Sequence, residues 1–248
     1  IAQVLVGHPF DTVKVRLQTG QYSSLGECIR GTIRSDSVTG FYRGVQSPLL
    51  GIGLCNLVLF SAYGRALAST ESQDAWRYVK AGALAGIPMA LVTCPVELLK
   101  VQLQTQSGQF RGILDCARHL LRERGMASLY GGFGITVLRE VPSFAGYFGA
   151  YEACKRQLGL GPVLSGAVAG ICAWLPCYPQ DVLKSVIQGH RGPPIGIRDA
   201  ARDVYTRYGI PGFFRGFTPT MLRAVPANAA TFLAYETAMR VASGAGVK

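Results

Sequence analysis

The sequence predicts an all-α membrane protein with six transmembrane helices, arranged as three pseudo-symmetric repeats around a central cavity. Two observations support this fold class. Three series of similar segments recur in phase along the 248 residues, and long runs without a formal charge lie between them. Such self-similarity at a fixed period indicates a repeated structural unit. We therefore interpret residues 1–248 as one domain with repeats at 1–70, 71–158 and 159–248.

The first series combines a proline, an acid and a lysine. Its copies are Pro9-Phe-Asp11-Thr-Val-Lys14, Pro95-Val-Glu97-Leu-Leu-Lys100 and Pro179-Gln-Asp181-Val-Leu-Lys184. Positions 9, 95 and 179 are 86 and 84 residues apart. A proline inside a helix removes a backbone hydrogen bond and bends the helix. Pro9, Pro95 and Pro179 are therefore predicted to kink the first, third and fifth helices toward a common axis.

Two further series keep the same phase. The second is Tyr42-Arg43-Gly44, Tyr130-Gly131-Gly132 and Phe214-Arg215-Gly216, and the third is Tyr63-Gly64, Tyr151-Glu152 and Tyr235-Glu236. In both series successive copies are 88 and 84 residues apart, as positions 44, 132 and 216 show. Agreement of three independent series is not expected by chance.

The helices follow in chain order. The first begins at Ile1 inside an apolar stretch, so we expect its start to be missing. Residues 44–64 and 157–180 carry no formal charge over 21 and 24 residues, enough to cross a hydrocarbon core that needs about 20. The third span is charge-free over 16 residues, 81–96. The fourth and sixth contain Arg139-Glu140 and Arg223, which must face a protein interior or a water-filled cavity.

Two local patterns indicate which side of the membrane the short segments lie on and where the long helices pack closely. Sixteen of the 25 Lys and Arg residues lie in segments 14–43, 100–124 and 184–215, so these basic amphipathic segments share one face of the membrane. Small residues recur as Gly82-Ala-Leu-Ala-Gly86 and Gly166-Ala-Val-Ala-Gly170, where helices are predicted to approach closely.

Composition excludes several classes of protein. Apolar residues make up 49% and charged residues 16%, too few charges to cover a compact soluble surface. The net charge of +11 suits nucleic acid, an anionic membrane or anionic solutes equally. Seven cysteines without a CxxC pair favour neither disulfides nor zinc, and no P-loop, GxSxG, HExxH or dinucleotide motif occurs. We predict no enzyme activity, cofactor or metal. A soluble basic helical-repeat protein that binds nucleic acid is the alternative of another class.

The three proline motifs, each followed by an aromatic-basic-glycine step, resemble the signature of the mitochondrial carrier family, also called solute carrier family 25. The resemblance covers the whole chain apart from the start of the first helix. It implies a transporter of the mitochondrial inner membrane that works by alternating access. Its six tilted helices surround a cavity, and its short amphipathic helices lie on the matrix side.

The resemblance also assigns a matrix gate. Each acid of the proline motif is expected to pair with the lysine of the next repeat: Asp11 with Lys100, Glu97 with Lys184 and Asp181 with Lys14. A solvent-reachable pair contributes ~0 to 1 kcal/mol, so such a ring closes without locking. Gln102 matches the family's glutamine brace beneath a pair, and we expect one brace only. The alternative is three solvated helix ends with incidental charges.

A second gate is expected on the cytoplasmic side, where the family pattern is aromatic-acid-x-x-base. Only Tyr151-Glu152-Ala-Cys-Lys155 is complete here, with Glu236 as a further acid. Gly64 replaces the acid of the first repeat. Since this gate is incomplete, we expect the cavity to rest open to the cytosol or to interconvert readily.

Internal symmetry predicts the substrate site. Twelve residues before each tyrosine of the third series stand Gly51, Arg139 and Arg223, and Glu140 follows Arg139. Seven residues before the tyrosines are Asn56, Phe144 and Asn228. Arginine offers a planar fork to a carboxylate and glutamate accepts an ammonium, so the set suits a small zwitterion or a cationic amino acid. Alternatively, Glu140 partners one arginine structurally.

The dipeptide Arg139-Glu140 resembles carriers of ornithine, lysine, arginine, carnitine and acylcarnitines. Glu140 favours basic amino acids, because carnitine carriers tend to have aspartate there, and a carnitine or acylcarnitine carrier is the alternative. Cys55 stands where ornithine-type carriers have an acid, which leaves side-chain recognition open. A ligand-gated proton leak in the same fold is a further possibility. Trp174 either lines the cavity or faces lipid.

The remaining partners follow from the membrane setting. Helices that begin at glycine present backbone N–H groups to anions, so we predict that Gly44, Gly112, Gly132 and Gly216 bind anionic lipid such as cardiolipin. We expect a monomer that binds no nucleic acid. The histidines His8, His119 and His190 have no metal-ligand spacing.

Overall fold

The computed structural model of the chain describes residues 1–70, 76–106, 108–190 and 192–245. The side chains of Asn228 and Glu236, two predicted site residues, lie outside what it describes. Its described residues form helices and connecting turns. The long helices are α1 (Ala2–Gln18), α3 (Gln46–Ala68), α4 (Trp76–Thr105), α6 (Phe133–Gln157), α7 (Pro162–Gly189) and α9 (Phe217–Ala245).

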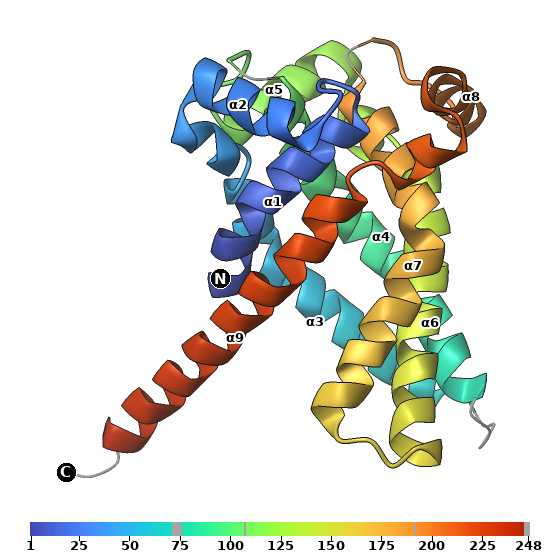
Figure 1. Cartoon of the computed structure of the whole chain (residues 1–248). Helices are drawn as coiled ribbons and strands as arrows, with labels where there is room; N and C mark the ends of the chain where they lie inside the picture. Colours follow the sequence, from blue (N-terminus) through green and yellow to red (C-terminus); the bar gives the residue numbers. More distant parts are fainter. Residues whose placement is uncertain (71–75, 107, 191, 246–248) are drawn as a thin grey trace.

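Three short helices gather at one end of the bundle, as the basic segments predicted (Figure 1). They are α2 (Leu25–Asp36), α5 (Ile113–Arg124) and α8 (Ile197–Tyr208), each of 12 residues. Each is followed by a five-residue 3₁₀ turn, namely η1 (Val38–Tyr42), η2 (Met126–Tyr130) and η3 (Ile210–Phe214). The repeat is therefore a repeat of backbone structure as well as of sequence.

The glycine that precedes each even-numbered transmembrane helix has the same conformation in all three repeats. Gly44, Gly132 and Gly216 have φ of +79°, +78° and +78°, a left-handed region that favours glycine. A Cβ on Gly44 would lie 3.0 Å from the carbonyl oxygen of Lys100 in the next repeat. These glycines thus let the start of each even helix pack on the odd helix of the following repeat.

Apolar side chains on the outside of the bundle follow helical spacing. On α3, Leu50, Leu54 and Leu57 are 74%, 52% and 64% exposed at intervals of four and three residues. Leu164, Ile171 and Leu175 form a similar stripe on α7. Among the described residues, Val38–Ala68 and Trp76–Thr105 are long and apolar enough to cross a membrane. An apolar outer face of this extent fits a lipid environment and does not fit a soluble helical-repeat protein.

The two predicted small-residue contacts differ. A Cβ on Gly82 would lie 2.5 Å from the carbonyl oxygen of Phe144, and one on Gly86 would lie 2.8 Å from Cα of Val141. The first pair therefore allows α4 and α6 to pack backbone to backbone. The prediction for Gly166 and Gly170 is wrong, because no described atom lies within 4 Å of a Cβ at either position.

The motif prolines lie within helices, and most of the cysteines are buried, although Cys172 is exposed. Pro9, Pro95 and Pro179 lie inside α1, α4 and α7, where the sequence predicts kinks. All seven cysteines are free thiols. Burial raises the pKa of Cys116, on the buried face of α5, to about 12, so its thiol stays neutral at physiological pH and packs as an apolar group.

Candidate substrate-binding site

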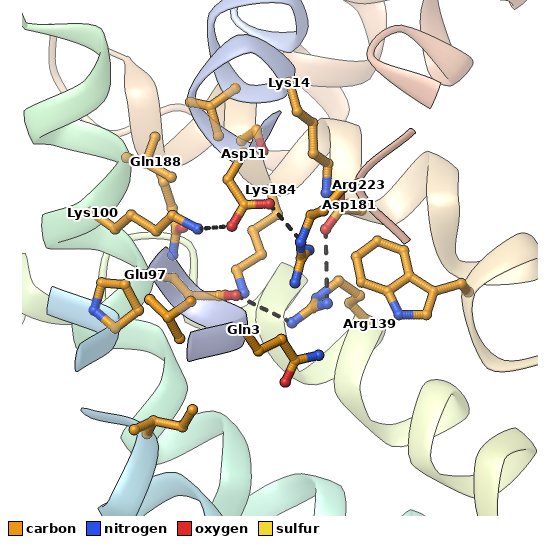
Figure 2. A pocket seen from close by; sticks show the side chains of 17 residues that line it. Gln3, Asp11, Lys14, Glu97, Lys100, Arg139, Asp181, Lys184, Gln188 and Arg223 are labelled. Atoms are coloured by element: carbon orange, nitrogen blue, oxygen red, sulfur yellow. Dashed lines mark hydrogen bonds and ion pairs between the residues drawn. The ribbon is translucent and has the colours of Figure 1, made fainter. Parts of the chain in front are cut away.

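A cavity of about 310 Å³ lies between the long helices (Figure 2). Every long helix contributes to its wall, from Gln3 on α1 to Arg223 on α9. Its charged lining residues are Asp11, Lys14, Glu97, Lys100, Arg139, Asp181, Lys184 and Arg223. The cavity therefore combines the proline-motif charges with two of the predicted substrate-binding residues.

The three predicted inter-repeat ion pairs are all present. Lys100 Nζ lies 2.6 Å from Asp11 Oδ2, and Lys14 Nζ lies 2.7 Å from Asp181 Oδ2. Lys184 pairs with Glu97. The Lys100 and Asp11 side chains are each only 16% exposed, so this pair is more buried than the solvent-reachable pair we expected. Removing one partner of a buried pair costs about 3–5 kcal/mol, because the other charge is left uncompensated.

The two arginines reach the same acids. Arg223 Nη1 lies 3.1 Å from Asp11 Oδ1. Arg139 lies between two acids, with Nη2 3.6 Å from Glu97 Oε1 and Nη1 3.7 Å from Asp181 Oδ1 (Figure 2). The sequence predicted arginines at one level of the cavity but did not predict that they would join the gate.

Glu140 lies behind this ring. Its side chain is 5% exposed, pairs with Arg139 and does not line the cavity. This is the structural pairing that the sequence left open. Arg223 has no acid next to it in the sequence and pairs with Asp11 instead. The Nε atoms of Arg139 and Arg223 are buried without a hydrogen-bond partner in the described part of the chain. Both side chains line the cavity and are partly exposed, 12% for Arg139 and 29% for Arg223, so a ligand can approach their guanidinium groups from the cavity.

Trp174 lines the cavity and does not face lipid alone. Lys14 Nζ lies 4.7 Å from the centroid of its indole ring, within the range of a cation–π interaction. The sequence left this position open between cavity and lipid. The aromatic face now belongs to the same wall as the ion pair of Lys14 with Asp181.

The prediction of a brace by Gln102 is wrong. Gln102 Nε2 donates to the Gln188 carbonyl at 2.6 Å, away from the ion pairs. The brace comes instead from Gln18, whose Nε2 donates to Asp181 Oδ2 at 3.3 Å. Gln18 follows Lys14 by four residues, and Gln104 and Gln188 stand in the same relation to their lysines. This Lys-x-x-x-Gln repeat was the signal that sequence reasoning missed.

Two other predicted lining residues lie elsewhere. Gly51 is buried, and a Cβ there would lie 2.8 Å from Val96 Cγ1, so this position packs α3 on α4. Ile52 lines the cavity in its place. Asn56 is exposed and is not part of the cavity wall. The count from the tyrosines found the right level of α3, but the helix presents the neighbouring residue.

At the opposite end, Glu152, an acid of the predicted cytoplasmic gate, pairs with a base on its own helix. Glu152 Oε2 lies 2.8 Å from Arg156 Nε, one helical turn later on α6. Arg156 also contacts the hydroxyl of Tyr78 on α4, and its guanidinium lies 4.9 Å from that ring. This contact joins two helices of the same repeat. Lys155 is exposed.

Comparison with known proteins agrees with this geometry. The family described as "Mitochondrial carrier protein" matches at residues 1–69, 71–161 and 160–245. The "Mitochondrial basic amino acids transporter" of Bos taurus is 40% identical, over 98% of this chain and 89% of its own. The "Mitochondrial carnitine/acylcarnitine carrier-like protein" of Arabidopsis thaliana is 38% identical, over 95% and 92%. "Solute carrier family 25 member 45" of Mus musculus is 37% identical, over 96% and 94%.

A helix pair that is repeated three times around one charged cavity is typical of a membrane solute transporter. The chain belongs to the mitochondrial carrier family. The predicted fold class, transport function and multi-pass location in the mitochondrial inner membrane are thereby confirmed, and nothing supports the soluble nucleic-acid-binding alternative.

Proposed function

We propose that the chain carries basic amino acids, such as arginine, lysine and ornithine, across the inner membrane by alternating access, and that it catalyses no covalent reaction. The names of its Bos taurus and Homo sapiens relatives support this substrate class. The observation that carries the proposal is the pair of arginines, Arg139 and Arg223, on the wall of one cavity. Such a fork suits the carboxylate that all amino acids share.

Charge balance agrees with a ligand that brings a carboxylate. Five cationic side chains line the cavity, and they face the three proline-motif acids together with Glu140. One formal positive charge is left over. A substrate carboxylate between Arg139 and Arg223 offsets this charge. The two cationic groups of a basic amino acid are not part of this balance, so the count supports the carboxylate contact alone.

We assign the matrix gate to the three inter-repeat pairs, with Gln18 as the brace in place of Gln102. The gate is closed in this structure, because all three pairs are formed. The cytoplasmic gate is assigned to Glu152 and Glu236, with Arg156 and Lys155 as the available bases. Its Glu152–Arg156 contact lies within one repeat, so it adds nothing to closure between repeats. A carrier that rests open to the cytosol fits this asymmetry.

Transport of carnitine or acylcarnitines is the second candidate. The name of the Arabidopsis thaliana relative supports it. Carnitine also carries a carboxylate for the arginines, and its quaternary ammonium suits the face of Trp174. A basic amino acid carries two cationic groups that donate hydrogen bonds, whereas carnitine carries one quaternary ammonium, which donates none to a carboxylate.

We also propose that anionic lipid such as cardiolipin binds near Gly44, Gly112, Gly132 and Gly216, where helices begin, and that the carrier acts as a monomer. Gly112 is the N-cap of α5, and Gly132 is the N-cap of α6. Backbone N–H groups at a helix N-terminus favour a phosphate.

Uptake by proteoliposomes tests the substrate class. Purified protein is reconstituted, and uptake of labelled L-arginine, L-lysine, L-ornithine and L-carnitine is compared in liposomes loaded with the same solute and in empty ones. We expect all three amino acids to enter faster than carnitine. Faster uptake into loaded liposomes indicates exchange, and equal uptake indicates uniport. Uptake of carnitine alone would contradict the proposal and support the second candidate.

A further inference from the structure

The residue immediately before the motif proline carries a side chain that can donate a hydrogen bond in every repeat. These three residues, which we call the pre-proline residues, are His8, Cys94 and Tyr178. They lie on α1, α4 and α7, and each is only 0–1% exposed. None of them lines the central cavity. A donor that is buried at the same place in each repeat, away from the solute, needs a role of its own.

Each pre-proline side chain contacts the same backbone carbonyl of its own repeat. The contacts are His8 Nε2 to the Arg43 oxygen at 2.9 Å, Cys94 Sγ to the Gly131 oxygen at 3.7 Å, and the Tyr178 hydroxyl to the Arg215 oxygen at 3.2 Å. Each carbonyl belongs to the residue before the left-handed glycine that precedes α3, α6 or α9. An imidazole, a thiol and a phenol therefore make equivalent contacts between an odd-numbered helix and the start of the even-numbered helix.

These carbonyls depend on a side-chain donor. They lie just before a helix, and no backbone N–H of the described residues outside the regular helices donates to them. For Arg215 the reason is visible in the sequence. The amide four residues later would be its partner in a helix, but residue 219 is proline and has no N–H. The pre-proline side chain thus supplies the hydrogen bond that the backbone of this turn lacks.

A glutamine of the next repeat approaches each pre-proline side chain as well. The pairs are Gln104 with His8, at 3.4 Å between the Nε2 atoms, Gln188 with Cys94, at 3.9 Å from Nε2 to Sγ, and Gln18 with Tyr178. Each glutamine follows a gate lysine by four residues. Every pre-proline residue therefore has one contact within its repeat and another to the neighbouring repeat.

The two contacts differ in what opening of the matrix side does to them. The lysine–acid pairs and the glutamine contacts join odd-numbered helices of different repeats, so they separate when these helices move apart. The contact with the carbonyl lies within one repeat and can persist. The pre-proline residue can therefore leave the glutamine while it holds the start of its own even-numbered helix.

We propose that His8, Cys94 and Tyr178 are positioning residues that make each even-numbered helix follow the odd-numbered helix of its own repeat when the matrix gate opens. The inference rests on the proposed alternating access and not on the identity of the solute. Even-numbered helices carry the residues assigned to the cytoplasmic gate, such as Glu152 on α6. The contact therefore transmits movement at the matrix side to the cytoplasmic side. Without the donor the even-numbered helix lags, and the transition slows although the cavity is intact.

The kinetics of exchange test this role, and Tyr178→Phe is the sharpest variant. It removes one oxygen and keeps the ring, whose centroid lies 5.8 Å from Lys14 Nζ. Proteoliposomes are loaded with the same solute, and the initial rate of uptake is measured against external concentration. The maximal rate is expected to fall about fivefold or more, the lower end for an acceptor that loses its donor. The half-saturating concentration is expected to stay within about twofold, because no cavity residue changes.

Ser165→Ala is the matched control on the same helix. Ser165 is buried at the opposite end of α7, and its hydroxyl donates to the Leu160 carbonyl at 3.2 Å. The variant also removes a buried hydroxyl from a backbone carbonyl, but not from the start of an even-numbered helix. It is expected to keep the maximal rate.

Rescue at His8 and the weak donor at Cys94 extend the test. His8→Gln keeps an N–H at the place of Nε2 and is expected to exchange faster than His8→Leu, which has no donor. Cys94→Ala is expected to slow exchange less than Tyr178→Phe does, because a thiol is a weak donor and its contact is long. This order follows donor strength and not the size of the side chain that is lost.

The outcomes separate failure of the inference from failure of the proposed substrate class. An unchanged maximal rate in both Tyr178→Phe and His8→Leu overturns the inference, as does equal slowing by Tyr178→Phe and Ser165→Ala. If the unchanged protein exchanges L-carnitine and no basic amino acid, the substrate class is overturned, and the same variants measured with labelled L-carnitine still decide the inference. If Tyr178→Phe fails to insert, the comparison of His8→Gln with His8→Leu decides.

Discussion

Ser37 has a positive φ, unlike any other non-glycine residue that the structure describes. It ends α2 with φ of 59° and ψ of −169°, a backbone conformation that residues other than glycine rarely adopt. The equivalent positions after α5 and α8 are Gly125 and Gly209, with φ of 70° and 64°. The first repeat thus uses a strained residue where the other repeats use glycine.

Ser37→Gly is predicted to stabilise the carrier by about 1 kcal/mol, since such backbone strain costs about 1–3 kcal/mol and the flexibility of glycine offsets part of the gain. Thermal unfolding of the purified protein in detergent measures the effect. Gly125→Ser is the matched control in the second repeat and is expected to lower the melting temperature by a similar amount. A melting temperature that stays the same in both variants would show that this turn adopts another conformation.

At the scale of elements, the contact of α4 with α6 depends on Gly82 and Gly86. Each would place a Cβ within 2.8 Å of backbone atoms on α6, which cannot rotate away as a side chain does. Their counterparts on α7, Gly166 and Gly170, have open space in the described structure. The same sequence pattern therefore serves packing in one repeat only.

Gly86→Ala is predicted to destabilise the protein by about 1–3 kcal/mol through overpacking. Gly166→Ala, the equivalent change on α7, is expected to be neutral or to stabilise the helix by about 0.5–1 kcal/mol. Melting temperatures of the two variants in the same detergent test the contrast. Equal losses in both would mean that both glycine pairs are packed.

The sequence determined most elements in advance. Repeats, six long helices and three short helices on one side followed from periodic motifs, because the same spacing forces equivalent residues to equivalent places. The three lysine–acid pairs were implied by the family resemblance, and all three are present. Side-chain choice within a turn was less predictable. The brace is Gln18, four residues after its lysine, rather than Gln102, two residues after its lysine. Each position along a helix turns a side chain by about 100°, so these two glutamines face different sides of their helices.

For the whole molecule, symmetry found the level of the substrate site but not its connections. Arg139 and Arg223 stand at equivalent positions, yet one bridges two acids and the other holds one. One cause is visible in the sequence, because Gly51 stands where the other repeats have an arginine. The other is a tertiary contact between α1 and α9, where a Cβ on Gly7 would lie 2.8 Å from Arg223 Nε, and a pattern along the chain does not contain it.

One cavity is lined by the lysine–acid pairs and by the two arginines. We assign closure of the matrix side to the pairs and recognition of the solute's carboxylate to the arginines. A carrier built this way loses transport when a guanidinium is removed, whether the loss acts on binding or on the gate. The cavity arginine that joins most partners is Arg139, which contacts Glu97, Glu140 and Asp181.

The most direct test is the initial rate of labelled L-arginine uptake by proteoliposomes that contain Arg139→Gln, compared with the unchanged protein and with Arg198→Gln on the exposed face of α8. Loss of a charge-assisted hydrogen bond costs about 1.5–3 kcal/mol, so uptake is predicted to fall about tenfold to a hundredfold. Arg198→Gln is predicted to retain the full rate. Uptake by correctly inserted Arg139→Gln protein at the unchanged rate would contradict the account.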